Sequence, residues 1–150
     1  MASQILSKYG TSTAITCTLN SLASSTTNVG RQGTMVDNST TRYGLIHLWV
    51  TLKTMTTSFA AGFGYVFFIA SDGTHITDGA GASDAAFTAV NATMLGALSL
   101  TTAATTYIKD FWIADPGPYW TVAISQNTVA ILDSSAGGTI YWVGDNLEAQ

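Results

Sequence analysis

The sequence predicts an all-β protein, an antiparallel β-sandwich of the jelly-roll type with about eight strands. Strand-forming Thr, Val, Ile and aromatic residues are abundant, and turn residues recur at short intervals. No segment has the pattern of a long helix, and only two prolines, Pro116 and Pro118, occur to interrupt strands. An immunoglobulin-like sandwich is the alternative, although the cysteine pair of antibody domains is missing.

The expected strands follow one another along the chain at short spacing. The C-terminal ones are separated by turns at 115–118, 126–128 and 133–138, which predict an antiparallel meander. A long, weakly patterned segment at 74–93 is expected to be a functional loop or a contact site. The strands are expected at residues 13–19, 34–36, 45–53, 64–70, 94–100, 105–114, 119–125, 129–132 and 139–143.

The segment 45–53 is the clearest strand. Its even-numbered residues are all apolar, whereas its odd-numbered residues, which include His47 and Trp49, are mixed. This alternation with a period of two predicts a strand with one buried face.

The segment 64–70 differs because both of its faces are apolar. Tyr65 and Phe67 fall on one face, and Phe68 falls on the other. We expect this strand either to be central, with both faces covered, or to take part in a subunit contact.

The first ten residues are expected to stand apart from a single sandwich domain at 11–150. Ile5, Leu6 and Tyr9 are apolar, and the segment is too short to bury them by itself. One interpretation is an N-terminal arm that docks on a neighbouring subunit. The other is a terminal strand of the chain's own sandwich, or a frayed end.

The composition favours a building block of an assembly. Only 9% of the residues are charged, 47% are hydrophobic, and about a quarter are Ser or Thr. The five basic residues are dispersed, which argues against a nucleic acid or an anionic membrane as partner. No apolar run reaches the roughly 18 residues of a membrane span, and the N-terminus lacks the apolar core of a signal peptide.

No arrangement of residues indicates catalysis, a cofactor or a metal ion. Glycosidase chemistry needs two carboxylates, but the only glutamate is Glu148, near the C-terminus. Asp72, His75 and Asp78 form a weak metal candidate that turn formation explains more simply. Cys17 is expected to be a small buried apolar residue. We therefore expect that the protein is not an enzyme.

The four tryptophans lie in predicted strands, where core or interface positions are more common than sugar platforms. We expect a subunit interface built from apolar residues of the arm and of the segments 45–53 and 64–70. Its members are Ile5, Leu6, Tyr9, Trp49, Tyr65, Phe67 and Phe68.

The order of the segments resembles a group of small tailed-bacteriophage virion proteins with jelly-roll folds. Some members of that class are capsid decoration, or cement, proteins. The resemblance covers most of the chain and assigns no catalytic residue. It is carried by the segments at 5–8, 15–23, 31–33, 36–38, 71–74, 95–98, 119–127 and 141–144.

The resemblance implies a structural virion protein made in the bacterial host cytoplasm and located on the outer capsid surface. We expect a homo-oligomer, with a trimer favoured, that bridges subunits of the major capsid protein and stabilises the head. The alternatives are a carbohydrate- or receptor-binding module of a tail fibre, which jelly-roll lectins make reasonable, and another connector of the virion.

Overall fold

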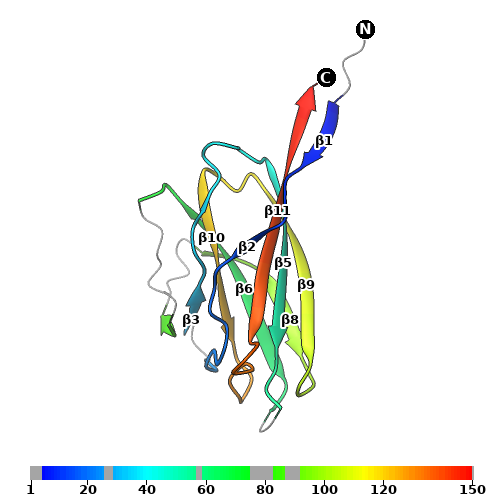
Figure 1. Cartoon of the computed structure of the whole chain (residues 1–150). Coiled ribbons are helices and arrows are strands. Elements are labelled where there is room, and N and C mark those ends of the chain that lie inside the picture. The colour runs from blue at the N-terminus through cyan, green and yellow to red at the C-terminus, as the bar shows by residue number, and fades with distance from the viewer. Residues whose placement is uncertain (1–4, 26–28, 57–58, 75–82, 87–91, 150) are drawn as a thin grey trace.

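The computed structural model describes residues 5–25, 29–56, 59–74, 83–86 and 92–149, and this part of the chain is all-β (Figure 1). Its strands form two antiparallel sheets that face each other. The eleven strands are β1 (Ile5–Tyr9), β2 (Thr13–Ile15), β3 (Val29–Gln32), β4 (Val36–Asp37), β5 (Leu45–Lys53), β6 (Gly62–Ser71), β7 (Ala85–Ala86), β8 (Ala92–Leu100), β9 (Thr106–Ala114), β10 (Tyr119–Gln126) and β11 (Gly138–Ala149).

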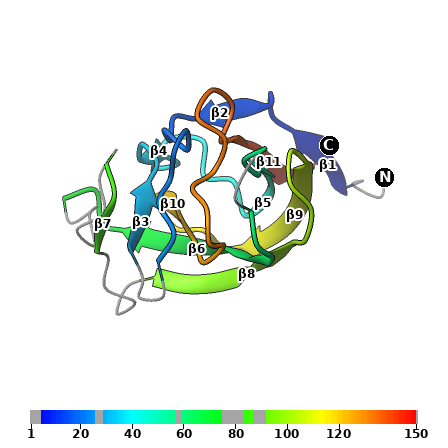
Figure 2. The same cartoon turned by 90° about the horizontal axis from the view of Figure 1, so that it is seen from below.

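The strand order is that of a jelly roll. Sheet A has the order β1-β11-β5-β9, with β2 also paired to β11, and sheet B has the order β7-β3-β10-β6-β8, with β4 also paired to β10. Figure 2 shows the two layers end on. The orders β2-β11-β5-β9 and β3-β10-β6-β8 are two interlocked Greek keys of eight strands. The fold class predicted from the sequence is confirmed.

The last three strands decide against the immunoglobulin-like alternative and against the predicted meander. β9 and β11 lie in sheet A, whereas β10 lies between them in sequence but belongs to sheet B. The predicted meander is therefore wrong, because the turns after β9 and β10 cross between sheets instead of joining neighbours. The expected strand at 129–132 is also wrong, since only Leu132 pairs there, in an isolated bridge to Thr54.

The alternation of β5 builds one wall of the core. Ile46, Leu48, Val50 and Leu52 are fully buried, and each such side chain stabilises the fold by about 1.5–3 kcal/mol. The odd-numbered residues of β5 therefore lie on the outer face of sheet A.

Four aromatic rings join the two sheets through the interior. Trp120 on β10 and Trp142 on β11 meet edge to face, with ring centroids 5.3 Å apart. Phe68 on β6 stacks on Trp120 at 5.8 Å, and Tyr43, just before β5, meets Trp142 at 5.8 Å. Trp120 is fully buried, so this contact lies at the centre of the core.

Strand β6 is a central strand, as one of its two interpretations expected. It lies between β10 and β8, and its own chain covers both faces. Phe68 belongs to the core, and Phe67 packs with Ile69 and Ala123 in a smaller cluster on the outer face of sheet B. Phe67 and Phe68 are thus already covered, which corrects the expectation that they meet another subunit.

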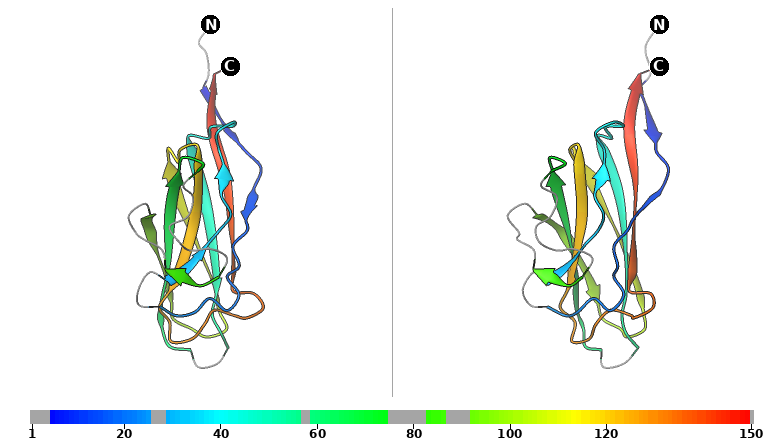
Figure 3. Two further views of the ribbon diagram at one scale, coloured as in Figure 1. Left: turned by 90° about the vertical axis from the view of Figure 1, so that its left-hand side faces the viewer. Right: turned by 60° about the vertical axis from the view of Figure 1, so that its left-hand side comes forward.

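The N-terminal segment is a strand of sheet A that also projects from it. β1 pairs with the end of β11, from Tyr9 opposite Asp145 to Ile5 opposite Ala149. β5 reaches only to Asp145, so this two-stranded ribbon extends beyond the body of the sandwich (Figures 1 and 3). At its root, Gly144 lies against the ring of Tyr43, where any larger residue would clash.

A buried carboxylate organises the turn between the last two strands. Asp133 Oδ1 accepts hydrogen bonds from Ser135 N at 2.9 Å, Ser135 Oγ at 2.8 Å and Ala136 N at 2.9 Å. Its Oδ2 lies 3.4 Å from Lys53 Nζ. The hydrogen bonds from Ser135 and Ala136, with the ion pair, lower the pKa of Asp133 to about 2.

We predict that Asp133→Asn weakens the fold at neutral pH and much less in strong acid. A carboxyl whose pKa is lowered by folding stabilises the protein above its ordinary pKa near 3.8, and this contribution disappears as the pH falls toward 2. Urea unfolding of both proteins at pH 7, 4 and 2 measures the difference. A difference that stays constant across this range would contradict the prediction.

Candidate functional site

The outer face of sheet A gathers exposed aromatic and aliphatic side chains. Ile108 is 69% exposed, Trp112 is 53% exposed and Tyr141 is 44% exposed. His47 and Trp49 lie between them on β5 and are half-buried. We call these five residues the aromatic face: His47, Trp49, Ile108, Trp112 and Tyr141.

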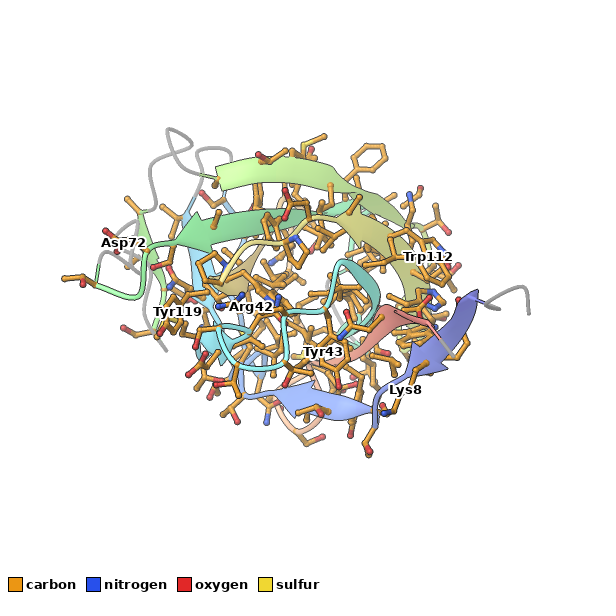
Figure 4. The ribbon with its side chains drawn as sticks, turned by 90° about the horizontal axis from the view of Figure 1, so that it is seen from above. Lys8, Arg42, Tyr43, Asp72, Trp112 and Tyr119 are labelled. Atoms are coloured by element: carbon orange, nitrogen blue, oxygen red, sulfur yellow. The ribbon has the colours of Figure 1, made fainter. Side chains whose placement is uncertain are left out.

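Strand register brings the five residues together from three strands. His47 on β5 is opposite Trp112 on β9, and Trp49 is opposite Tyr141 on β11. Ile108 is opposite Thr51, one row further along. Because directly opposite residues on one face are neighbours, these side chains form a continuous surface. Figure 4 labels Trp112 at the side of the sandwich that β9 forms.

The ring of His47 is held between two tryptophans. Its centroid lies 3.9 Å from that of Trp112, with the planes 14° apart, and 3.7 Å from that of Trp49. His47 Nε2 lies 2.9 Å from Oδ2 of Asp110, which is on the same face. This hydrogen bond is the main cause that lowers the pKa of Asp110. Stacking and hydrogen bonding thus hold His47 against both tryptophans and Asp110 on this face.

The aromatic face continues toward the projecting ribbon. Tyr9, which is 64% exposed, lies opposite Asp145 at the root of the ribbon, and Asp145 lies opposite Leu45 on β5. Asp145 is 9% exposed, and its Oδ1 has no hydrogen-bond partner among the described residues. The surface therefore extends from β9 across β5 and β11 to β1.

The outer face of sheet B is different, because the chain covers much of it. Phe67, Ile69 and Ala123 on that face are 6% exposed or less. Thr121 is fully buried, and its hydroxyl donates to Gly33 O at 2.8 Å. Phe63 on β6 and Met94 on β8 remain 45% and 56% exposed, but among the described residues sheet A has more exposed aromatic side chains.

The residues expected in an interface are distributed over several environments. Trp49 lies on the aromatic face and Tyr9 on the ribbon, whereas Tyr65 is half-buried on sheet B, where its hydroxyl accepts a hydrogen bond from Asn127 Nδ2 at 3.0 Å. Ile5 and Leu6 belong to β1, but their side chains lie outside the described part of the structure.

Sequence reasoning missed Ile108, Trp112 and Tyr141 as members of this surface. Ile108, Asp110 and Trp112 are alternate residues of one strand and therefore share a face. The charged Asp110 indicates that this face points outward. What the sequence does not contain is the pairing that places them beside β5 and Tyr141.

Four other residues considered in the sequence either have simple structural roles or lie outside the described residues. Burial of Cys17 against the core raises the pKa of its thiol to about 12, so the thiol stays protonated. Asp72 Oδ1 accepts a hydrogen bond from Thr74 N at 2.8 Å, as turn formation predicts. His75 and Asp78 lie outside the described residues.

Within the described residues, no group of three or more His, Cys, Asp and Glu side chains could hold a metal ion. The same part of the chain contains no helix of the length and apolar character that a membrane span needs. No family model, curated protein or solved structure matches this chain.

We predict that a buried and an exposed tryptophan contribute very differently to the free energy of unfolding. Trp120→Ala removes a fully buried ring and should cost about 3–5 kcal/mol of unfolding free energy. Trp112→Ser loses the stacking on His47 and should cost about 1 kcal/mol. Chemical unfolding measures both values. A loss at Trp112 as large as that at Trp120 would show that the aromatic face is part of the chain's own core.

Proposed function

We propose that this protein is a non-enzymatic structural protein that assembles through the aromatic face, and specifically a capsid decoration protein of a tailed bacteriophage. The proposal rests on the surface that His47, Trp49, Ile108, Trp112 and Tyr141 form on the outer face of sheet A, where three of the side chains are exposed and His47 stacks between two tryptophans. Monomeric soluble proteins rarely leave a broad apolar patch uncovered.

The chemistry of the surface suits a protein partner. Aromatic residues are enriched at the centre of protein interfaces, and charged residues are depleted there. None of the five side chains of the aromatic face is a carboxylate, and the neighbouring Asp110 is already hydrogen-bonded to His47, with 2.9 Å between Oδ2 and Nε2. Burying the face against a protein would therefore remove apolar surface from water without stranding an unpaired charge.

The ribbon offers a second kind of contact, in which a strand edge pairs through its backbone. The edge of β11 beyond Asp145 pairs with β1 on one side and with no described strand on the other. An open strand edge can take an added strand from a neighbouring chain. We infer that the aromatic face joins copies of this protein into a trimer, and that the ribbon engages the major capsid protein.

In this mechanism the decoration protein stabilises the head by adding interface area. A standard interface buries about 800 Å² on each partner. A trimer on the outer capsid surface would bridge neighbouring capsid subunits, so that their separation would expose these interfaces to water. The low charge of the chain, 9% of residues, fits surfaces that are buried on assembly.

A glycan-binding module is the second candidate, and one observation favours it. The face of an exposed tryptophan can stack on a sugar ring, and Trp112 is 53% exposed with the Asp110 carboxylate on the same strand face. Asp110 is itself 56% exposed and could accept hydrogen bonds from sugar hydroxyls. Here the same face would bind carbohydrate instead of protein.

We predict that the wild-type protein is a trimer in solution and that the double variant Trp112→Ser/Tyr141→Ser is monomeric. Both substitutions remove exposed rings from the aromatic face, so the fold should remain. Light scattering after size-exclusion chromatography measures the mass. Val129→Ser is the matched control, because Val129 is 74% exposed but lies in the loop after β10. A monomeric wild type would contradict the assembly.

We also predict that a chain lacking residues 1–9 stays trimeric and fails to bind expanded capsid shells. The deletion removes β1, the described partner of β11 beyond Asp145, so the two-stranded ribbon cannot form, and it leaves the aromatic face in place. Co-sedimentation with shells compares it with the full chain. The glycan-binding candidate replaces the proposal under a different set of results. In that case the full chain does not co-sediment with the shells but binds glycans on an array, and Trp112→Ser abolishes the glycan binding.

A further inference from the structure

A pocket of about 390 Å³ opens at the end of the sandwich from which the ribbon projects. It lies between two loops, residues 38–44 before β5 and residues 115–118 after β9. Figure 4 looks onto this end and labels Arg42 and Tyr43. The volume is within the usual range for small-molecule sites. The pocket is separate from the aromatic face, since the two share no residue.

One buried side chain locks the two loops together. Asn38 is 3% exposed, and its Nδ2 donates to Tyr43 O at 3.1 Å and to Gly117 O at 3.0 Å. Its Oδ1 accepts from Tyr43 N at 2.8 Å. A further backbone bond of 2.8 Å joins Asp115 N to Gly44 O. The walls of the pocket are therefore preformed and do not depend on a ligand.

The backbone is strained at the two charged residues of the pocket. Arg42 has φ of 54° and Asp115 has φ of 49°, and both values lie in the left-handed region that disfavours residues other than glycine. These are two of the four non-glycine residues with positive φ in the described part of the chain. Strain of this kind tends to collect at binding sites, where it fixes the direction of a side chain.

The guanidinium of Arg42 has donors that no described residue uses. Its Nε donates to Ser39 O at 3.2 Å, but its two terminal nitrogens bind no acceptor among the described residues. Arg31 pairs with Asp84, and Lys53 pairs with Asp133. A planar guanidinium with both terminal nitrogens open is suited to a carboxylate, which it binds with two parallel hydrogen bonds.

The remaining polar groups of the pocket accept hydrogen bonds. The Asp115 carboxylate has no donor among the described residues. The hydroxyl of Ser39 donates to Asp37 Oδ1 at 2.6 Å, which leaves its lone pairs as acceptors. A ligand must therefore offer donors beside its carboxylate. Asp115 also repels a second negative charge, which disfavours phosphate.

We propose that this pocket binds a sugar acid, a monocarboxylate that carries several hydroxyl groups, of which a hexuronate is the simplest form. Arg42 holds the carboxylate, and Asp115 and Ser39 accept hydrogen bonds from the hydroxyls. Tyr43 and Pro118 supply apolar surface for the ring carbons. This site would operate whether or not the chain assembles through the aromatic face.

Isothermal titration with D-glucuronate tests the site on the full chain. We expect D-glucuronate to bind, and acetate, methyl glucoside and inorganic phosphate each to bind at least about tenfold more weakly, since each lacks one required feature. A uronate disaccharide distinguishes a polysaccharide from the free acid as the natural source: tighter binding than the monomer supports the polysaccharide, and equal binding supports the free acid. No binding of either uronate overturns the proposal.

Arg42→Gly is the decisive variant because it separates binding from folding. Glycine accepts the left-handed φ, so the melting temperature should stay the same or rise. Uronate affinity should fall at least about tenfold with the loss of a charged hydrogen-bonded pair. Arg42→Lys should also lose affinity, because an ammonium cannot form the paired contact.

Two further variants complete the test. Asp115→Asn keeps an oxygen acceptor and removes the repelling charge, so phosphate, with its larger negative charge, should gain more affinity than D-glucuronate. Lys109→Gln is the control, because Lys109 lies on β9, where its Nζ donates to Ala97 O, 2.9 Å away. If Arg42→Gly binds D-glucuronate within about twofold of the wild type, or no more weakly than Lys109→Gln, the pocket is not the binding site.

Discussion

The contact between Trp120 and Trp142 determines which face of each sheet lies inside the sandwich. Side chains alternate along a strand, so a buried Trp142 on β11 places its neighbour Tyr141 outside. Pairing carries that parity across sheet A, from Tyr141 to Trp49 and then to Asp110. A core built on two tryptophans therefore forces other aromatic residues of the same sheet to the surface.

The two outer faces of the sandwich differ in how far the chain itself covers them, and the proposed function depends on this difference. The chain covers Phe67 and Ile69 on sheet B, but on sheet A it leaves Ile108 and Trp112 more than half exposed. Turning such residues polar would not disturb the core, because their side chains point away from it. Their exposure is explained if another chain covers them, and the open edge of the ribbon offers a second point of attachment.

Much of the fold follows from local pattern. The segment 45–53 alternates so regularly that its predicted bounds match those of β5, and the crossing connections agree with the predicted jelly roll. The pairing partners could not be predicted, since both turns after β9 and β10 resemble hairpin turns although they cross between sheets. The short strand β3 was missed because its Gly30 and Arg31 lack a strand pattern, and it is held by pairing with β10.

The candidate site was only partly predictable for the same reason. Trp49 in the predicted strand 45–53 and Tyr9 in the N-terminal segment could be picked from the sequence as apolar residues. The stacking of His47 between Trp49 and Trp112 could not, because it depends on long-range register. Phe68 was wrongly expected in a subunit interface. Its aromatic neighbours in the sequence suggest apolar surface that one chain cannot bury, but Phe68 packs in the core of its own chain. Apolar content alone does not distinguish a central strand from an interface.

The central claim is that the aromatic face is buried against another chain when the protein is assembled. A cryo-electron microscopy reconstruction of capsid shells carrying the protein would test it most directly, through the surroundings of Trp112. We expect Trp112, which is 53% exposed in the single chain, to lie against a second protein chain in the assembled particle. A reconstruction in which the outer face of sheet A is open to solvent would contradict it.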